Sequence, residues 1–251
     1  MCKATVLGMP VDVTDLNSTI SSIENLLLLG TGAYVCVSNV HMCMEFYDDA
    51  SFQSVLKSAD LVLPDGRPIF WAQRFLGHSN ASQVRGQDIM EALCEKSSRD
   101  GLRIGLYGGS SAEVLDTVMD VLRKSYPGVD VVYAYSPPFR ELTVDEDIKV
   151  VRDICESKVD VLFVGIGCPK QERWMMKHKN DLNCVMLGVG AAYDFIAGTK
   201  QHAPRFIQYL GFEWLFRLLS EPRRLWKRYL IQNPRFVYHF FAQLILKNDS
   251  K

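Results

Sequence analysis

The stretch Ala59-Asp60-Leu61-Val62-Leu63-Pro64-Asp65-Gly66-Arg67-Pro68 decides the fold, because it joins a short buried strand to a polar turn. Residues 61–63 form an apolar run typical of a buried strand, and Pro64 ends it. In an open α/β sheet, ligands bind at the carboxyl ends of the strands. Asp65 stands at that end, so its carboxylate is a candidate catalytic group. Pro, Asp and Gly are also the usual residues of a tight turn, so the stretch alone leaves both interpretations open.

Apolar runs and amphipathic stretches alternate on both sides of this strand. Strands are expected at residues 34–38, 61–63, 103–107, 129–135, 159–165 and 184–189, after a strand or hairpin at residues 6–13. Helical stretches separate the strands. This alternation predicts an α/β fold with a Rossmann-like, mainly parallel sheet and helices on both of its faces.

Capping residues and prolines predict where several helices begin and end. One helix is expected over residues 42–57. Ser110 is expected to cap a later helix, because Glu113 stands at the spacing of a capping box. Pro222 and Pro234 are expected to divide the C-terminal segment into two or three amphipathic helices.

Composition indicates an ordinary globular protein. The chain has 251 residues, of which 48% are hydrophobic and 23% charged, enough to bury a core without disulfides. Its seven cysteines are scattered and include no C-x-x-C pair, which favours a reducing compartment and argues against a zinc site. The strand–helix alternation stops near residue 203, so a catalytic domain over 1–202 and an appendage over 203–251 are expected.

The near-zero net charge conceals an asymmetry between these two parts. Residues 205–247 contain eight Lys/Arg and two Asp/Glu, whereas the rest of the chain contains 20 Lys/Arg and 27 Asp/Glu. The same segment carries 11 of the 27 aromatic residues. A basic, aromatic tail predicts an anionic partner. Its longest apolar run, residues 236–246, is too short to cross a bilayer.

Three expected strands end in closely spaced glycines: Gly108-Gly109, Gly165-x-Gly167 and Gly188-x-Gly190. Such turns let backbone N–H groups approach a phosphate at a helix N-terminus. None of them matches the dinucleotide fingerprint or the P-loop, so an oxidoreductase or P-loop enzyme is not favoured. The three turns together predict a nucleotide or sugar-phosphate site, although each alone is equally a tight strand-to-helix turn.

Metal binding and thiol catalysis are poorly supported. The D-x-D sequence in the stretch Asp145-Glu146-Asp147 stands where a helix start favours acidic residues. Cys168 follows a glycine turn and could act as a nucleophile, but no histidine lies near it in the sequence. We therefore interpret Cys168 as a spectator and expect no metal ligands.

Five ordered motifs extend along most of the chain. They are ADLVLPDG (59–66), RGQD (85–88), GIGCPKQERW (165–174), GVGAAYDFIAG (188–198), and EWLFRL with EPRRL (213–218 and 221–225). In this order and spacing they resemble the WecG/TagA/CpsF family of bacterial glycosyltransferases, over nearly the whole chain.

The resemblance implies an inverting, metal-independent transfer of a sugar from a UDP-sugar to a polyprenyl-diphosphate-linked saccharide. It also implies a Rossmann-like domain whose C-terminal helical appendage completes the site and meets the anionic inner leaflet. The protein is then expected to be cytoplasmic and peripheral to the membrane. No cofactor and no nucleic acid is expected, and self-association stays open.

Site residues follow from the motifs. By resemblance, Asp65 is the general base, and Ser38 and Asn39 position a substrate; Ser38 stands where Thr is common. Lys227 stands where Arg is usual. Donor or acceptor binding is expected of Arg85, Gly108, Gly109, Gly167, Lys170, Gln171, Glu172, Gly190, Asp194, Arg217, Arg224 and Lys227.

Two alternatives stay open at this point. Glu172 and Asp194 could hold sugar hydroxyls or only brace loops. The basic residues of the appendage could bind phosphate or only form a solvated or lipid-facing strip. A membrane-tethered module that binds nucleotide sugars without catalysis is the alternative function, and a catalytic acid such as Asp65 is the feature that it would not need.

Overall fold

The computed structural model describes residues 2–201, 203–204 and 213–248. Within these residues a six-stranded parallel sheet has the order β4-β3-β8-β7-β5-β6. The strands are β3 (Ala33–Ser38), β4 (Leu61–Pro64), β5 (Arg103–Gly108), β6 (Asp130–Tyr135), β7 (Val161–Gly165) and β8 (Val185–Gly188). The predicted α/β fold is therefore confirmed.

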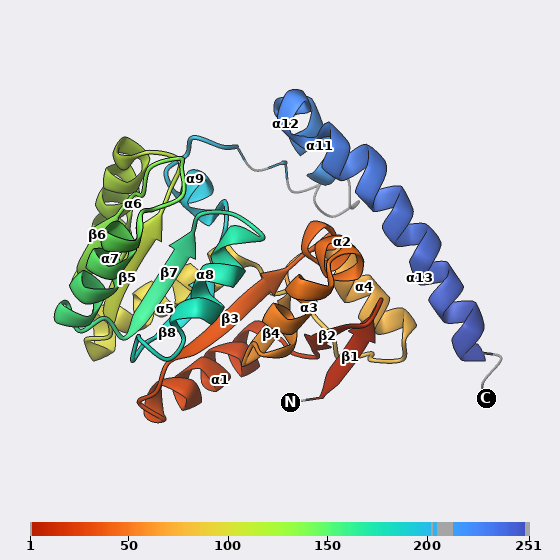
Figure 1. Cartoon of the computed structure of the whole chain (residues 1–251), viewed down its shortest axis with the longest axis horizontal. Helices are drawn as coiled ribbons and strands as arrows, with labels where there is room; N and C mark the ends of the chain where they lie inside the picture. Colours follow the sequence, from red (N-terminus) through yellow and green to blue (C-terminus); the bar gives the residue numbers. More distant parts are fainter. Residues whose placement is uncertain (1, 202, 205–212, 249–251) are drawn as a thin grey trace.

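Helices cover both faces of the sheet (Figure 1). They are α1 (Leu16–Leu28), α2 (Val40–Asp48), α3 (Ala50–Lys57), α4 (Arg67–Phe75), α5 (Gly86–Asp100), α6 (Ala112–Ser125), α7 (Val144–Glu156), α8 (Lys170–His178) and α9 (Ala192–Ile196). The C-terminal segment forms α11 (Glu213–Ser220), α12 (Pro222–Trp226), the π-helix η1 (Lys227–Gln232) and α13 (Asn233–Asn248).

The alternation of side chains along the strands creates two cores. Tyr34 and Cys36 of β3 pack toward α2, α3, α7 and α8. Ala33, Val35 and Val37 pack on the other face, toward α1, α5, α6 and α9. Because successive side chains of a strand point to opposite faces, a continuous apolar run is the pattern of a strand covered on both sides. Burial of each large apolar side chain contributes roughly 1.5–3 kcal/mol.

A hairpin of β1 (Lys3–Val6) and β2 (Met9–Asp12) lies beside the edge strand β4. The carboxylate of Asp12 accepts a hydrogen bond from the Val62 backbone N–H at 2.8 Å. Lys3 lies 3.7 Å from the same carboxylate, and burial raises the pKa of Asp12. The hairpin thus satisfies a donor on an edge strand that would otherwise face solvent or another chain.

Three local expectations were wrong. The helix expected over residues 42–57 is broken at Asp49, because the Asp49 carboxylate caps α3 by accepting hydrogen bonds from the backbone N–H groups of Ser51 and Phe52. Ser111, not Ser110, caps α6. Pro234 does not break the C-terminal helix, because it lies in the first turn of α13, directly after η1.

The C-terminal helix α13 packs across the hairpin and α2 (Figure 1). Phe236 and Phe240 are buried in the core that contains α2. The Gln243 side chain accepts a hydrogen bond from the Leu7 N–H at 2.9 Å and donates one to the Thr5 carbonyl at 2.8 Å.

No helix of the described ranges is both long and apolar enough to cross a membrane. Since 202 and 205–212 lie outside the described residues, the division at 202/203 stays a prediction.

Replacing Phe240 with Ala should loosen α13 far more than replacing its neighbour Phe241. Phe240 is 7% exposed and Phe241 60% exposed. Loss of a buried phenyl ring costs about 3–5 kcal/mol, whereas an exposed substitution stays within about 0.5 kcal/mol. Hydrogen exchange of the α13 amides in the full chain measures both, and equal acceleration by the two substitutions would contradict this packing.

Candidate functional site

A cavity of about 1060 Å³ lies where the C-terminal helices pass over the carboxyl ends of β3, β4, β7 and β8. The sheet side contributes Asn39, Asp65, Gly167 and Gly190, each from the loop after one of these strands. The opposite wall comes from α11, α12, η1 and α13. The two parts of the chain that differ in charge therefore build one cavity between them.

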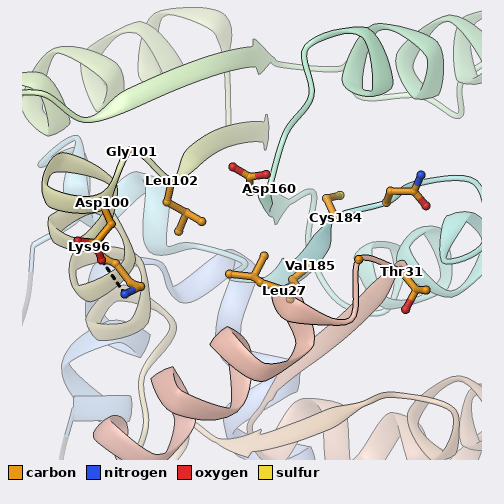
Figure 2. A pocket seen from close by; sticks show the side chains of 11 residues that line it. Leu27, Thr31, Lys96, Asp100, Gly101, Leu102, Asp160, Cys184 and Val185 are labelled. Carbon is orange, nitrogen blue, oxygen red and sulfur yellow. Dashed lines mark hydrogen bonds and ion pairs between the residues drawn. The ribbon is translucent and has the colours of Figure 1, made fainter.

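A second cavity, of about 400 Å³, lies at the opposite end of the strands, where β5, β7 and β8 begin (Figure 2). Its charged residues already have partners. Lys96 pairs with Asp100 at 2.7 Å and with Glu24 at 2.8 Å, and Asp160 pairs with Arg103 at 2.6 Å. The larger cavity is the better candidate site, because it is roomier and lies at the ligand-binding edge of a parallel sheet.

Backbone hydrogen bonds hold the loop that carries Asp65. The Asp65 and Gly66 N–H groups donate to the Ser38 carbonyl at 2.8 and 3.2 Å, and the Gln83 amide donates to the Asp65 carbonyl at 2.6 Å. A Cβ at Gly66 would lie 3.2 Å from the Asn39 Cβ, so glycine lets the two loops approach closely. Asp65 is both a turn residue and a lining residue of the cavity.

Arg228 links the two walls of the cavity. Its guanidinium donates a hydrogen bond to the Asn39 side-chain oxygen at 2.9 Å. The same oxygen caps α2 by accepting from the Met42 N–H at 3.3 Å. Among the described residues no carboxylate forms a salt bridge with Arg228, and burial lowers its pKa, with Arg217 and Arg224 adding to the effect. Arg228 is half-buried, and such an arginine favours an anionic ligand, because removing a charge from water without a counterion is costly.

The π-helix η1 presents this side chain to the cavity. Lys227, Arg228 and Gln232 of η1 all line the cavity. Gln232 also accepts a hydrogen bond from His41 Nδ1 at 2.9 Å. Burial and the charge of Arg228 lower the pKa of His41, which favours the neutral imidazole. A single π turn inside a longer helix is frequently found at a functional site.

Positive charge dominates the described lining of the cavity. The cationic side chains are Arg67, Arg85, Arg217, Arg224, Lys227 and Arg228, and the acidic one is Asp65. Two of the cations are partly neutralised, Arg85 by Asp88 at 2.8 Å and Arg224 by Glu221 at 2.5 Å. The remaining excess charge, held in a partly desolvated cavity, suits a diphosphate.

Gln171 and Glu172 lie beneath the end of β8. The Gln171 amide donates to Glu172 Oε1 at 2.7 Å, while Glu172 Oε2 is buried and has no hydrogen-bond partner within the described part of the chain. A Cβ at Gly188 would lie 2.8 Å from the Gln171 amide nitrogen, so this close approach requires glycine. Burial raises the pKa of Glu172 to about 7.

Nine of the fifteen expected site residues line the cavity: Asn39, Asp65, Arg85, Gly167, Gln171, Gly190, Arg217, Arg224 and Lys227. The other six do not: Ser38, Gly108, Gly109, Lys170, Glu172 and Asp194. Lys227 is exposed, and its ammonium lies 5.6 Å from the Trp226 ring.

The six expected site residues that do not line the cavity have other positions in the fold. The Ser38 hydroxyl is buried and donates to the Leu63 carbonyl at 2.7 Å, and Lys170 is exposed. Asp194 accepts a hydrogen bond from Ser110 at 2.8 Å and pairs with Lys200. A Cβ at Gly108 would lie 2.5 Å from the backbone of Gly165, so the Gly108-Gly109 turn serves close strand packing rather than the cavity.

Several lining residues carried no clear signal in the sequence. His41, Gln83 and Arg228 lie outside any motif that indicates chemistry, and Trp71 resembles an ordinary helix residue. Only the cluster of basic residues around Arg228 pointed to that residue. Arg228 contacts Asn39 from a π turn, and local sequence patterns do not reveal such a turn.

A family model described as "Glycosyl transferase WecG/TagA/CpsF family" matches residues 4–250. The chain belongs to this family. Members of the WecG/TagA/CpsF family are glycosyltransferases, and the suspected resemblance is thereby confirmed.

Similar curated proteins carry the name N-acetylglucosaminyldiphosphoundecaprenol N-acetyl-beta-D-mannosaminyltransferase. One from Bacillus spizizenii is 28% identical over 89% of this chain and 85% of its own length. One from Bacillus subtilis is 27% identical over 100% of this chain and 93% of its own length. One from Staphylococcus aureus is 26% identical over 94% and 91%, respectively. The WecG/TagA/CpsF similarity thus extends through the C-terminal helices.

The buried Glu172 should make stability fall as the pH rises. The folded protein keeps this proton up to about pH 7, whereas the pKa of an ordinary Glu is 4.5. Folding therefore takes up a proton at pH values between these two pKa values, and Glu172→Gln removes that uptake. In urea unfolding, the free energy of unfolding of the variant relative to that of the wild type should therefore increase between about pH 5 and pH 8, by on the order of 3 kcal/mol. Glu141→Gln controls for loss of a surface charge, and a pH-independent difference for Glu172→Gln would contradict the burial argument.

Proposed function

We propose that the protein transfers a sugar from a UDP-sugar to polyprenyl-diphosphate-linked N-acetylglucosamine, with inversion at the anomeric carbon and without a metal ion. The observation that carries this proposal is that Asp65 shares one cavity with Arg217, Arg224 and Arg228. The names of the three relatives contain an undecaprenyl-diphosphate-linked N-acetylglucosamine, which supports this acceptor class.

Asp65 is suited to act as the general base. Its loop is held by backbone hydrogen bonds, and it is the acidic residue of the described cavity lining. In a single displacement, its carboxylate takes the proton of the acceptor hydroxyl while that oxygen bonds to the anomeric carbon. The bond from that carbon to the diphosphate oxygen breaks, and UDP leaves with the electron pair. Attack opposite the leaving group inverts the configuration.

The arginines supply the charge that the departing UDP requires. Negative charge grows on the diphosphate as the sugar bond breaks, and positioned cations stabilise that charge most where water is excluded. Arg217 lies on α11, Arg224 on α12 and Arg228 on η1, so all three belong to the segment that covers the sheet edge. Donor binding is thereby coupled to the packing of the C-terminal helices.

Such an enzyme would work as a peripheral protein at the inner face of the cytoplasmic membrane, where its lipid-linked acceptor resides. The basic, aromatic C-terminal segment supports this location, since cationic segments are attracted to anionic lipid headgroups. The transferred sugar would be identified by screening UDP-sugars, with UDP-N-acetylmannosamine first because of the relatives' names.

Replacing Asp65 with Asn should abolish transfer while UDP binding persists. The substitution keeps the size of the side chain but removes the base, and positioned bases contribute about 10²–10⁴-fold to rates. Product formation from radiolabelled UDP-sugar and N-acetylglucosaminyl-diphosphoundecaprenol, measured with EDTA present, tests the base and the metal-free mechanism together. UDP affinity by calorimetry is the control, and full turnover by Asp65→Asn would exclude Asp65 as the base.

Replacing Arg228 with Ala should slow transfer about 10²-fold, as for the loss of one stabilising donor. Arg223→Ala is the matched control, because Arg223 lies in the same helical run but is exposed and outside the cavity lining. The transfer rate of Arg228→Lys should be intermediate, since lysine keeps the charge but lacks the planar set of N–H donors of the guanidinium. Equal rates for Arg228→Ala and Arg223→Ala would contradict a role for Arg228 in the reaction.

A further inference from the structure

The cavity lining also contains exposed apolar side chains, which differ in chemistry from Asp65 and Arg228. They are Trp71 of α4 and Leu230, Val237 and Tyr238 of η1 and α13. These side chains are 39%, 56%, 48% and 72% exposed, so they form the mouth of the cavity rather than its interior. The proposed chemistry of sugar transfer uses none of them.

The apolar surface continues outward along both helices. Phe75 follows Trp71 by one helical turn and is 73% exposed. On α13, Phe241 and Ile245 follow Tyr238 at spacings of three and seven residues, are 60% and 62% exposed, and therefore share its face. Both helices line the cavity, and their inner sides join the same core. Two exposed apolar rows thus lead away from the mouth.

Such a surface needs an apolar partner. Large apolar side chains that gather on an exposed surface mark sites of contact with other molecules. The mouth belongs to the same cavity as the cationic wall of Arg217, Arg224 and Arg228, so a suitable ligand is strongly anionic at one end and a narrow hydrocarbon at the other. Trp71 and Tyr238 line a concave surface, so they can contact a single hydrocarbon chain and not only a flat lipid surface.

We propose that the isoprenoid chain of the lipid-linked acceptor leaves the site between α4 and α13, with its first units against Trp71 and Tyr238. This inference rests on the proposed function and deepens it, because it assigns the route of the lipid. The acceptor diphosphate lies toward the arginines, and the hydrocarbon follows the two apolar rows toward the membrane. The enzyme then recognises the chain as well as the sugar and diphosphate.

The test compares two acceptors that carry the same sugar diphosphate. One bears an undecaprenyl chain and the other only a methyl group, and both are assayed in detergent micelles so that vesicle binding plays no part. The double variant Trp71→Ser/Tyr238→Ser should lose about tenfold in kcat/KM for the undecaprenyl acceptor, as expected for losing apolar contact, and little for the methyl acceptor.

Phe139→Ser is the matched control, because Phe139 is 90% exposed but lies in the loop before α7, outside the cavity lining. It should leave the preference for the long chain unchanged. An unchanged preference in the double variant, or an equal loss with both acceptors, would overturn the lipid route while sugar transfer itself persists. Absence of transfer by the wild type to either acceptor would instead refute the proposed function.

Discussion

The parallel pairing of β3 with β4 and β8 is the constraint on which the site depends. Ser38 is aligned with Pro64, and Cys36 with Gly188, so the three strands end close to one another. Every loop that follows them therefore emerges at one edge of the sheet. Asn39 and Asp65 lie together there because the register of β3 and β4 brings them together, although they are 26 positions apart in the sequence.

The C-terminal helices form the second half of the site, and their packing has an electrostatic consequence. Hydrophobic burial of Phe236 and Phe240 holds α13 against α2 and the hairpin. That packing also fixes η1 over the sheet edge, where Arg228 lines the cavity and donates to the Asn39 amide oxygen, with no carboxylate paired to it in the described ranges. Desolvating a cation in this way opposes folding, and an anionic ligand would offset the cost. Stability and ligand affinity are thus coupled through one side chain.

The cavity also has two kinds of chemistry. Its lining combines charges and amides from strand ends and from η1 with exposed apolar side chains of α4 and α13. The two kinds of side chain suit different portions of an amphiphilic ligand. Because α4 begins directly after Asp65 and Gly66, one short segment carries the candidate base and Trp71 of the mouth.

The sequence by itself determined the α/β fold, because strands covered on both faces must be apolar throughout, and that pattern is readable in any local window. It also determined the family, through motifs that keep their order and spacing and that contain Asp65 and Arg217, two residues of the cavity lining. Only the tertiary structure decided which residues meet. Ser38 and Glu172 are turned into the core, whereas Arg228 faces the cavity through a π turn. The Arg228 contact with Asn39 joins segments 189 residues apart, and no local pattern encodes it.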